Sequence, residues 1–452
     1  MERIWQDKKF LKDMLVIAIP IALQNLITSS LNMVDTLMIS ELGKSSIAAV
    51  GLANQLFFFY SLIIFGINSG SSIFISQYWG KKDTENIKRV LGLAVSFSAI
   101  AGLLFTIIAL FFPETVMRFF IKEPMVVKLG SDYLRVVSLS YIITGISFAY
   151  SIASRSIGKA NMPMVVAGFS FITNTVFNYL LIFGKFGFPE LGVKGAAYGT
   201  LIARIVEIVF ILYFVYKDIE PLAAKVSELF NWTKDFIKRY LRTIYPVIIN
   251  EALWALGQVM YSAAYARIGE EATAAVQVSS TIQNVFFVLV RGLANACTVM
   301  VGNKIGAGDE EESYDYAIQF LIMSTLAGLI LGGALALTPD LTLKLFRNLD
   351  SDVYTLSRKL IIIGGMFYFI RTFNSTLIVG VLRGGGDTNF SMYLEMGAVW
   401  LIGVPLAFMG VLLFKMPVYI VFILVSFEEI VKAVIGFPRV KSKKWIRNIT
   451  EN

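Results

Sequence analysis

Residues 21–39 read IALQNLITSSLNMVDTLMI, and Asp35 carries the one ionisable side chain in this otherwise apolar and uncharged stretch. A helix of about 20 residues crosses a hydrocarbon core of ~30 Å, so the stretch is long enough to span a membrane. An ionised carboxylate inside a bilayer is costly unless something compensates its charge, and acids at this depth are functional candidates by default. We therefore interpret Asp35 as a functional residue.

The composition assigns the whole chain to the membrane. Hydrophobic residues make up 56% of it, charged residues 16%, and the mean hydropathy is +0.69, which soluble globular domains do not show. We predict an all-α integral membrane protein with twelve transmembrane helices, the first of which is too long for a cleaved signal peptide. The predicted spans are 12–39, 46–77, 89–112, 130–157, 164–186, 194–216, 243–268, 272–303, 314–338, 356–383, 389–414 and 417–437.

The second half of the chain repeats the first, in two registers that differ slightly. The first register pairs Pro20 with Pro246, Gly80 with Gly306, and Asp83 with Asp309. The second register applies further along each half and pairs Arg155 with Arg383. The repeat unit holds six helices, an even number, so both halves keep the same membrane orientation. We therefore predict two pseudo-symmetric six-helix lobes related by an axis along the membrane normal, with a cleft between them.

The longest charged connection falls at the middle of the chain. It divides the sequence into an N-terminal lobe (1–216), a cytoplasmic linker (217–242), a C-terminal lobe (243–437) and a basic cytoplasmic tail (438–452). With the N-terminus inside, cytoplasmic segments hold about 23 Lys and Arg against about 12 outside. This bias predicts a multi-pass protein of the cell membrane with both termini in the cytoplasm. It also explains the net charge of +8 without a nucleic-acid partner.

The sequence has no histidine, and its single cysteine, Cys297, lies in an apolar span. An intramolecular disulfide is excluded, and proton chemistry would have to use carboxylates, assisted by tyrosine. Asn174 and Asn178 are four residues apart and share one face of a helix, toward which Thr200 of the next helix can turn. With Asp35 they form a set of hard oxygen ligands. Such a set can hold a dehydrated Na⁺ or stabilise alternate protonation states of the acid; alternatively, the asparagine pair only bonds helix to helix.

The equivalent positions in the second half are Tyr261 for Asp35, and the apolar Ile402 and Leu406 for the two asparagines. One half therefore keeps an acid on its first helix where the other has a tyrosine. This difference predicts that the cation-coupling site lies in the N-terminal lobe.

The chain resembles the multidrug and toxic compound extrusion (MATE) transporters over nearly its whole length. The resemblance rests on the Asn-Met-Val-Asp-Thr run at 32–36 with Gly43 after it, the Gly80 and Gly306 loops with following acids, Asn174 and Asn178, and the Pro-Glu-Leu-Gly run at 189–192. It implies a V-shaped pair of lobes that exports organic, often cationic, compounds by antiport with sodium ions or protons. Family members use an aspartate on helix 1 and polar residues on helices 5 and 6 for coupling, and Asp35, Asn174, Asn178 and Thr200 match those places.

Further residues are expected to bind substrate or to bend helices. The substrate-binding candidates are Glu251, Tyr261, Glu395 and Gln24. Glu251 resembles the family's glutamate on helix 7 but lies about one turn earlier, so it either contacts a cationic substrate or pairs with an arginine such as Arg291 or Arg371. Arg204 and Glu207, three residues apart, form either an internal ion pair or part of a site. Pro20 and Pro246 interrupt the hydrogen bonding of helices 1 and 7 and should bend them.

Other functional classes fit the sequence less well. A membrane enzyme would need a metal-binding or nucleophilic constellation, and none is recognisable, so we expect no enzyme and no cofactor beyond the coupling ion. A channel would normally line its pore with residues of both lobes or of several subunits, whereas the polar residues singled out here lie in one lobe. A lipid-linked oligosaccharide flippase of a related two-lobe fold is the closest alternative. We expect a monomer in the lipid bilayer that binds small organic molecules.

Overall fold

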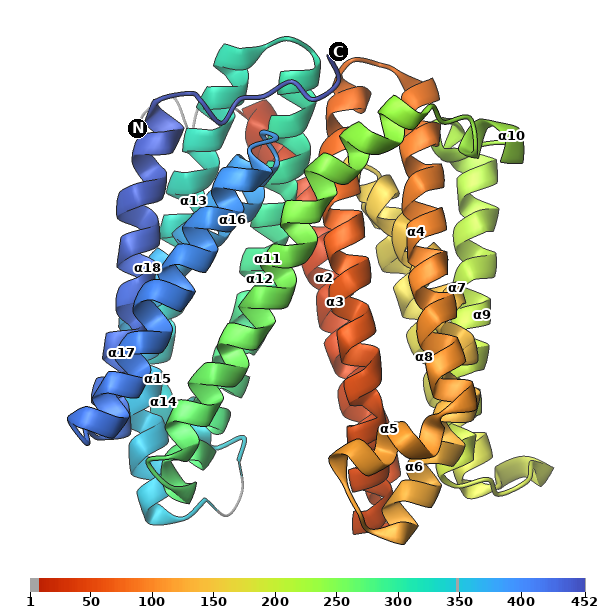
Figure 1. Cartoon of the computed structure of the whole chain (residues 1–452), viewed down its shortest axis with the longest axis vertical. Helices are drawn as coiled ribbons and strands as arrows, with labels where there is room; N and C mark the ends of the chain where they lie inside the picture. The colour runs from red at the N-terminus through yellow and green to blue at the C-terminus, as the bar shows by residue number, and fades with distance from the viewer. Residues whose placement is uncertain (1–7, 347–348, 452) are drawn as a thin grey trace. The chain divides into compact units, whose positions relative to one another are not determined.

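The computed structural model describes residues 8–346 and 349–451, which fold into helices joined by short loops (Figure 1). The first half contains α2 (Lys8–Ser40), α3 (Lys44–Gly80), α4 (Thr84–Phe111), α5 (Pro113–Phe120), α6 (Pro124–Val137), α7 (Leu139–Ser156), α8 (Asn161–Phe183), η1 (Lys185–Gly187), α9 (Val193–Asp218), η2 (Glu220–Leu222) and α10 (Val226–Leu229). The second half contains α11 (Lys234–Ala266), α12 (Glu270–Gly306), α13 (Glu310–Leu337), α14 (Pro339–Leu343), α15 (Ser351–Ser375), η3 (Thr376–Arg383), α16 (Thr388–Ala398), η4 (Val399–Gly403), α17 (Val404–Phe408), η5 (Met409–Leu413) and α18 (Val418–Lys441).

Each of the twelve predicted spans coincides with a helix or with consecutive helices. In the described part of the chain, nine helices are long and apolar enough to cross a membrane, and the pair α6 and α7, bent by 48°, makes a tenth. The remaining two predicted spans fall on α11, with 33 residues, and α18, with 24 residues. α18 carries Glu428, Glu429 and Lys432 in its interior, which lowers its hydropathy.

The chain forms two compact units. Unit 1 comprises 1–22, 76–82 and 249–452, and unit 2 comprises 23–75 and 83–248. The chain passes between the units four times, and two of these passages lie inside α2 and α11, each two residues after a proline of the repeat, Pro20 or Pro246. Residues 217–242, predicted as a linker, belong to unit 2, where Lys88 pairs with Glu228 at 3.0 Å. The domain boundaries at 217 and 243 stay a prediction.

The repeat is visible in local structure. Asp83 and Asp309 are the N-caps of α4 and α13, and their carboxylates accept backbone N–H groups of residues three positions on, at 3.0 and 3.3 Å. In unit 1, Gly80 lies against the backbone carbonyl of Asn303, and Gly306 lies against that of Gln77. A Cβ at either glycine would overlap the facing backbone. These glycines are therefore needed for the close contact of two helix ends.

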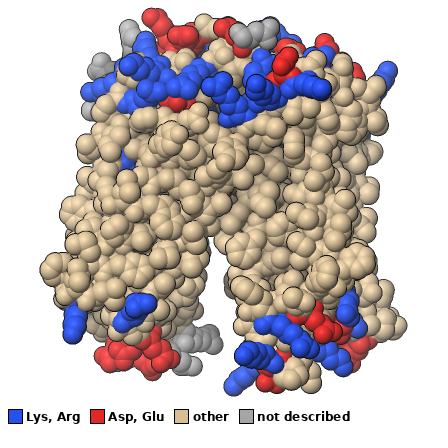
Figure 2. All heavy atoms as spheres, viewed as in Figure 1, with Lys and Arg blue, Asp and Glu red and all other residues tan. Residues whose placement is uncertain are grey.

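Charged side chains gather at the helix ends. On the face shown in Figure 2, Lys, Arg, Asp and Glu lie at the ends of the helices of each unit, and the helix middles between them are almost free of charge. This distribution fits a hydrocarbon layer around the helix middles. The charges inside the units are therefore the candidates for function.

Candidate functional site

The four residues predicted to bind the coupling cation lie together in unit 2. The Nδ2 amide of Asn178 on α8 donates to Oδ1 of Asp35 on α2 at 2.7 Å and to Oδ1 of Asn174 at 3.0 Å. The Nδ2 of Asn174 in turn lies 3.4 Å from Oγ1 of Thr200 on α9. α8 and α9 run side by side, which brings the two asparagines and the threonine to one place (Figure 1). The structure thus joins three helices through one polar chain.

The cluster is largely buried and contains one oxygen that has no partner within the part of the chain that the structure describes. The side chains of Asn174 and Asn178 are 1% and 0% exposed. Asp35 and Thr200 are partly exposed at the surface of the structure. Oδ1 of Asn178 is buried and has no hydrogen-bond partner in the described residues. A buried acceptor without a partner costs free energy, so a further donor or cation at this oxygen would be favourable. The donor set of carboxylate, amide and hydroxyl oxygens suits Na⁺.

Gly199 on α9 holds Asn178 in place. A Cβ at residue 199 would lie 3.0 Å from both Cγ and the backbone nitrogen of Asn178 and would overlap its Oδ1. The absence of a side chain at Gly199 therefore lets α9 approach α8 closely enough to place the amide on Asp35.

The sequence prediction overlooked Tyr133 on α6, which is 5% exposed beside the cluster, with its hydroxyl 3.4 Å from Oδ1 of Asn54 on α3. No sequence spacing marked this tyrosine. Arg204 was predicted either to pair with Glu207 or to be part of a site, and it binds Glu207 at 2.5 Å. It also acts electrostatically on Asp35. The sequence could have indicated that Arg204 lies near the cluster, because Arg204 is four residues after Thr200 and so on the same face of α9.

The repeat-equivalent position in unit 1 is a tyrosine, as the sequence shows, and this tyrosine contacts an acid from another helix. The hydroxyl of Tyr261 donates to Oε2 of Glu428 on α18. In the second register of the repeat, Glu428 is equivalent to Thr200, and Lys432 is equivalent to Arg204. Lys432 is 3% exposed and binds Glu428 and Glu429 at 3.1 Å each. The first half therefore has its carboxylate on its first helix, whereas the second half has it on its last helix.

Glu251 pairs with an arginine, but not with either of those named from the sequence. Arg383, at the end of the π-helical segment η3, binds Glu251 at 2.7 Å and Glu395 at 3.3 Å, and its side chain is 2% exposed. The guanidinium groups of Arg291 and Arg371 lie over the ring of Phe287 instead, at 5.8 and 4.6 Å. Which arginine faces Glu251 depends on how each helix is rotated about its own axis. The sequence alone does not determine that rotation. Asn250 further fixes Glu395 through a hydrogen bond of 2.5 Å.

The remaining predicted residues are in well-defined places. Gln24 on α2 accepts a hydrogen bond from Nη2 of Arg155 on α7. Pro20 and Pro246 lie inside continuous helices. Their role in bending, and the substrate-binding roles of Gln24, Tyr261, Glu251 and Glu395, stay predictions.

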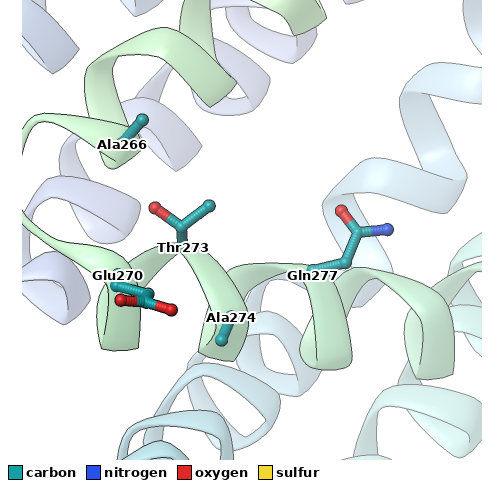
Figure 3. A pocket seen from close by; sticks show the side chains of 5 residues that line it. All are labelled: Ala266, Glu270, Thr273, Ala274 and Gln277. Atoms are coloured by element: carbon teal, nitrogen blue, oxygen red, sulfur yellow. The ribbon is translucent and has the colours of Figure 1, made fainter. Parts of the chain in front are cut away.

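An open depression of about 600 Å³ lies where α11 ends and α12 begins. Figure 3 shows the residues that line it, which are Ala266, Glu270, Thr273, Ala274 and Gln277. It contains none of the predicted site residues and offers one carboxylate among small or neutral side chains. We do not assign it a role.

The family model MatE matches residues 20–180 and 246–409. A relative in Thermotoga maritima, named "Probable multidrug resistance protein NorM", is 26% identical and the match covers 90% of this chain and 86% of the relative. One in Bacillus subtilis, "Probable multidrug resistance protein YoeA", is also 26% identical, with 88% and 86% covered.

Solved structures agree with the fold. One described as the outward-facing conformation of a multidrug resistance MATE family transporter has a TM-score of 0.87 at 21% identity, with 96% of each chain covered. A transporter of the MOP superfamily from Pyrococcus furiosus has the same TM-score and identity, with 98% and 97% covered. The predicted fold class, an all-α membrane protein of twelve helices in two six-helix lobes, is confirmed.

Proposed function

We propose that this chain, which belongs to the MatE family, is a secondary active transporter that exports small organic compounds, many of them cationic, in exchange for H⁺ or Na⁺. Support for the transported compounds comes from the relatives named multidrug resistance proteins. Support for the exchange comes from the cluster of Asp35, Asn174, Asn178 and Thr200. In this proposal the chain is a transporter and not an enzyme.

The observation that carries the proposal is the orphaned Oδ1 of Asn178 beside the hydrogen-bonded carboxylate of Asp35. A permanently paired carboxylate has one state and cannot couple two fluxes. Asp35 is bound by a neutral amide, so a proton, a sodium ion or a cationic compound can each compensate its charge in turn. Mutually exclusive occupation of one carboxylate is a sufficient basis for antiport, and alternating access would let each occupant enter from its own side.

The exchange requires that Asp35 change partners, and its neighbours limit which partners it can take. Asn178 donates to the ionised acid at 2.7 Å, and Arg204, although bound to Glu207, contributes positive charge nearby. Both favour the ionised carboxylate when no cation is present. A bound cation would add the free amide oxygen as a ligand, and its loss would restore the starting arrangement.

The setting that we propose is the cell membrane, with both chain termini in the cytoplasm and the protein acting as a monomer. The basic-residue bias supports this orientation. The multidrug names of the relatives do not favour the lipid-linked oligosaccharide flippase considered from the sequence.

The test is drug efflux from proteoliposomes under separately imposed sodium and proton gradients. Asp35→Asn keeps the size and most hydrogen bonding of the side chain but removes its charge. We expect the variant to fold, as judged by gel filtration, and to lose gradient-driven efflux under both gradients. Thr36→Val, at the exposed neighbouring position, is the control and should keep coupling. Normal coupling in well-folded Asp35→Asn would refute the assigned role of Asp35.

A further inference from the structure

A short segment near the C-terminus, residues 447–449, holds the end of α3 within unit 1, and we call this segment the strap. The side chain of Gln77 on α3 is 0% exposed, and the strap occupies both ends of its amide. Nε2 of Gln77 donates to the backbone oxygen of Arg447 at 3.1 Å, and Oε1 accepts the backbone N–H of Ile449 at 2.9 Å. The backbone N–H of Arg447 donates to the oxygen of Gly385 at 2.8 Å. The strap therefore ties the last turns of α3 to the loop between η3 and α16.

The chain just before the strap is held more firmly than the strap itself. Trp445 is 0% exposed and lies against Gly385, and Nε of Arg439 donates to Oδ2 of Asp387 at 2.8 Å. Arg447 pairs with the other oxygen of Asp387 at 3.0 Å, but its side chain is 46% exposed, and that oxygen accepts no hydrogen bond from the described residues. An exposed ion pair contributes little. The strap can therefore detach while Trp445 and Arg439 keep the tail in place.

The internal repeat has no counterpart of this arrangement in the first half. Asp387, whose carboxylate is fully buried, is equivalent to Lys159 in the second register, and Lys159 is exposed. The place where the tail docks is thus specific to the second half. The docked tail is an addition to the repeated helices and not part of the packing that the two halves share.

α3 is the helix on which the strap acts, and it passes from one unit to the other. Its residues belong to unit 2 as far as Ile75 and to unit 1 from Ser76 to its end. Within unit 1 this end lies against α12, where a Cβ at Gly302 would be 2.9 Å from Cβ of Ser76. Alternating access requires the two units to rearrange. A rearrangement that moves the end of α3 away from α12 would have to break the hydrogen bonds between Gln77 and the strap.

We propose that the strap is a conformational device that stabilises the transporter in the state closed toward the cytoplasm, and that it detaches when that side opens. This inference rests on the proposed transport function and on the cytoplasmic location of the tail. Three hydrogen bonds and one exposed ion pair hold the strap, and each contributes modestly. Such a contact can shift the balance between two states without preventing either.

The experiment measures how fast a thiol behind the α3–α12 contact reacts. Ser76→Cys, in a Cys297→Ser background, places a thiol at a position that is 0% exposed and lies against Gly302. Its reaction with a small water-soluble maleimide is followed on the purified full-length protein in detergent, without drug or ion gradient. Because the reagent reaches this position when α3 and α12 separate, the rate reports how often the cytoplasmic side opens.

Two changes to the strap should speed this reaction. A chain that ends at Ile446 loses every strap contact but keeps Trp445 and Arg439, and we expect labelling at least tenfold faster than in the complete chain. Ile449→Pro removes only the N–H that donates to Gln77, and it should speed labelling roughly two- to tenfold, the effect of one hydrogen bond. Ile449→Ala is the matched control, because it changes the same side chain but keeps this N–H, and it should label like the complete chain.

A second thiol distinguishes opening of the cytoplasmic side from a general loss of structure. Ser357→Cys places it in α15 of unit 1, at a position that is also 0% exposed, and its rate should not change when the strap is removed. An unchanged rate at residue 76 in the chain that ends at Ile446, or an equal increase at residues 76 and 357, would overturn the proposal. Gradient-driven efflux by the wild type tests the proposed function separately, because labelling needs neither transport nor a coupling ion.

Discussion

Gly199→Ala tests the coupling site without changing any of its proposed ligands. The new methyl group would overlap Oδ1 of Asn178 and lie 3.0 Å from its Cγ and backbone nitrogen. The backbone nitrogen cannot move without shifting α8, so the amide must rotate away from Asp35. The variant therefore breaks the 2.7 Å hydrogen bond to the carboxylate while leaving every polar side chain in the sequence.

The size of the effect follows from that bond. A hydrogen bond to a charged group contributes about 1.5–3 kcal/mol. If sodium is the coupling ion, displacing the amide removes its oxygen as a ligand, and a net ligand contribution of about 1.4 kcal/mol would raise the sodium concentration for half-maximal efflux roughly tenfold. If the ion is a proton, losing the donor destabilises the ionised acid, so the acid binds its proton more tightly. The midpoint of efflux then moves up by about one to two pH units.

The assay is efflux from proteoliposomes at stepped sodium concentrations and at stepped pH. Gly168→Ala in α8 is the control, because a Cβ there meets nothing within 4 Å. It should fold and transport like the wild type. A well-folded Gly199→Ala protein whose half-maximal sodium concentration and pH midpoint both match those of Gly168→Ala would refute the assignment of Asn178 to the coupling site.

Three further predictions address stability and topology. Lys432→Met should lower the free energy of unfolding by about 3–5 kcal/mol, because it leaves the buried carboxylate of Glu428 and the partly buried one of Glu429 without their cation; a thermal midpoint equal to that of the wild type would contradict this. Trp445→Ala should cost about 3–5 kcal/mol, since the indole is 0% exposed and packs on the 385 loop, and unchanged thermal stability would show that the tail is not docked. In a Cys297→Ser background, cysteines at Lys44 and Lys234 should react with an impermeant reagent from outside and inside respectively; labelling from one side would reject the helix count.

The sequence predicted the spans well because a membrane helix must be continuously apolar over a fixed length, and this signal is local. It was less accurate where helices break. The span predicted at 130–157 begins at Pro124 and bends at Ser138, where α6 ends and α7 begins, and the short α5 before it was not predicted. The apolar interpretation of 417–437 passed over three charged residues, which are tolerated there because the lysine pairs with both carboxylates inside the unit.

The C-terminal tail, residues 438–452, is a second case in which the sequence did not indicate tertiary contacts. The basic residues of 438–452 predicted a cytoplasmic tail, and their spacing indicated no partner for it within the fold. Instead, Arg439 and Arg447 bind the fully buried carboxylate of Asp387 at 2.8 and 3.0 Å, and the backbone at 447–449 bonds to the side chain of Gln77. Composition gives the charge of a segment, but the partner of that charge depends on tertiary structure.

The internal repeat predicts which positions of the two halves are equivalent, but it does not predict which residue type stands at each. The differences in residue type between equivalent positions bear on function. Thr200 and Glu428 are repeat equivalents, as are Asp35 and Tyr261, so each unit has one carboxylate and one hydroxyl at these positions, on exchanged helices. The two acids differ in their cations. Glu428 binds Lys432 at 3.1 Å, whereas Arg204, the equivalent of Lys432, is occupied by Glu207 at 2.5 Å and leaves Asp35 to a neutral amide. A carboxylate already neutralised by a fixed lysine has little to gain from a mobile cation, whereas one held by an amide gains a full charge interaction. The argument for coupling at Asp35 is therefore stronger from the structure than from the sequence, because the second unit shows what the same arrangement becomes once its acid has a permanent partner.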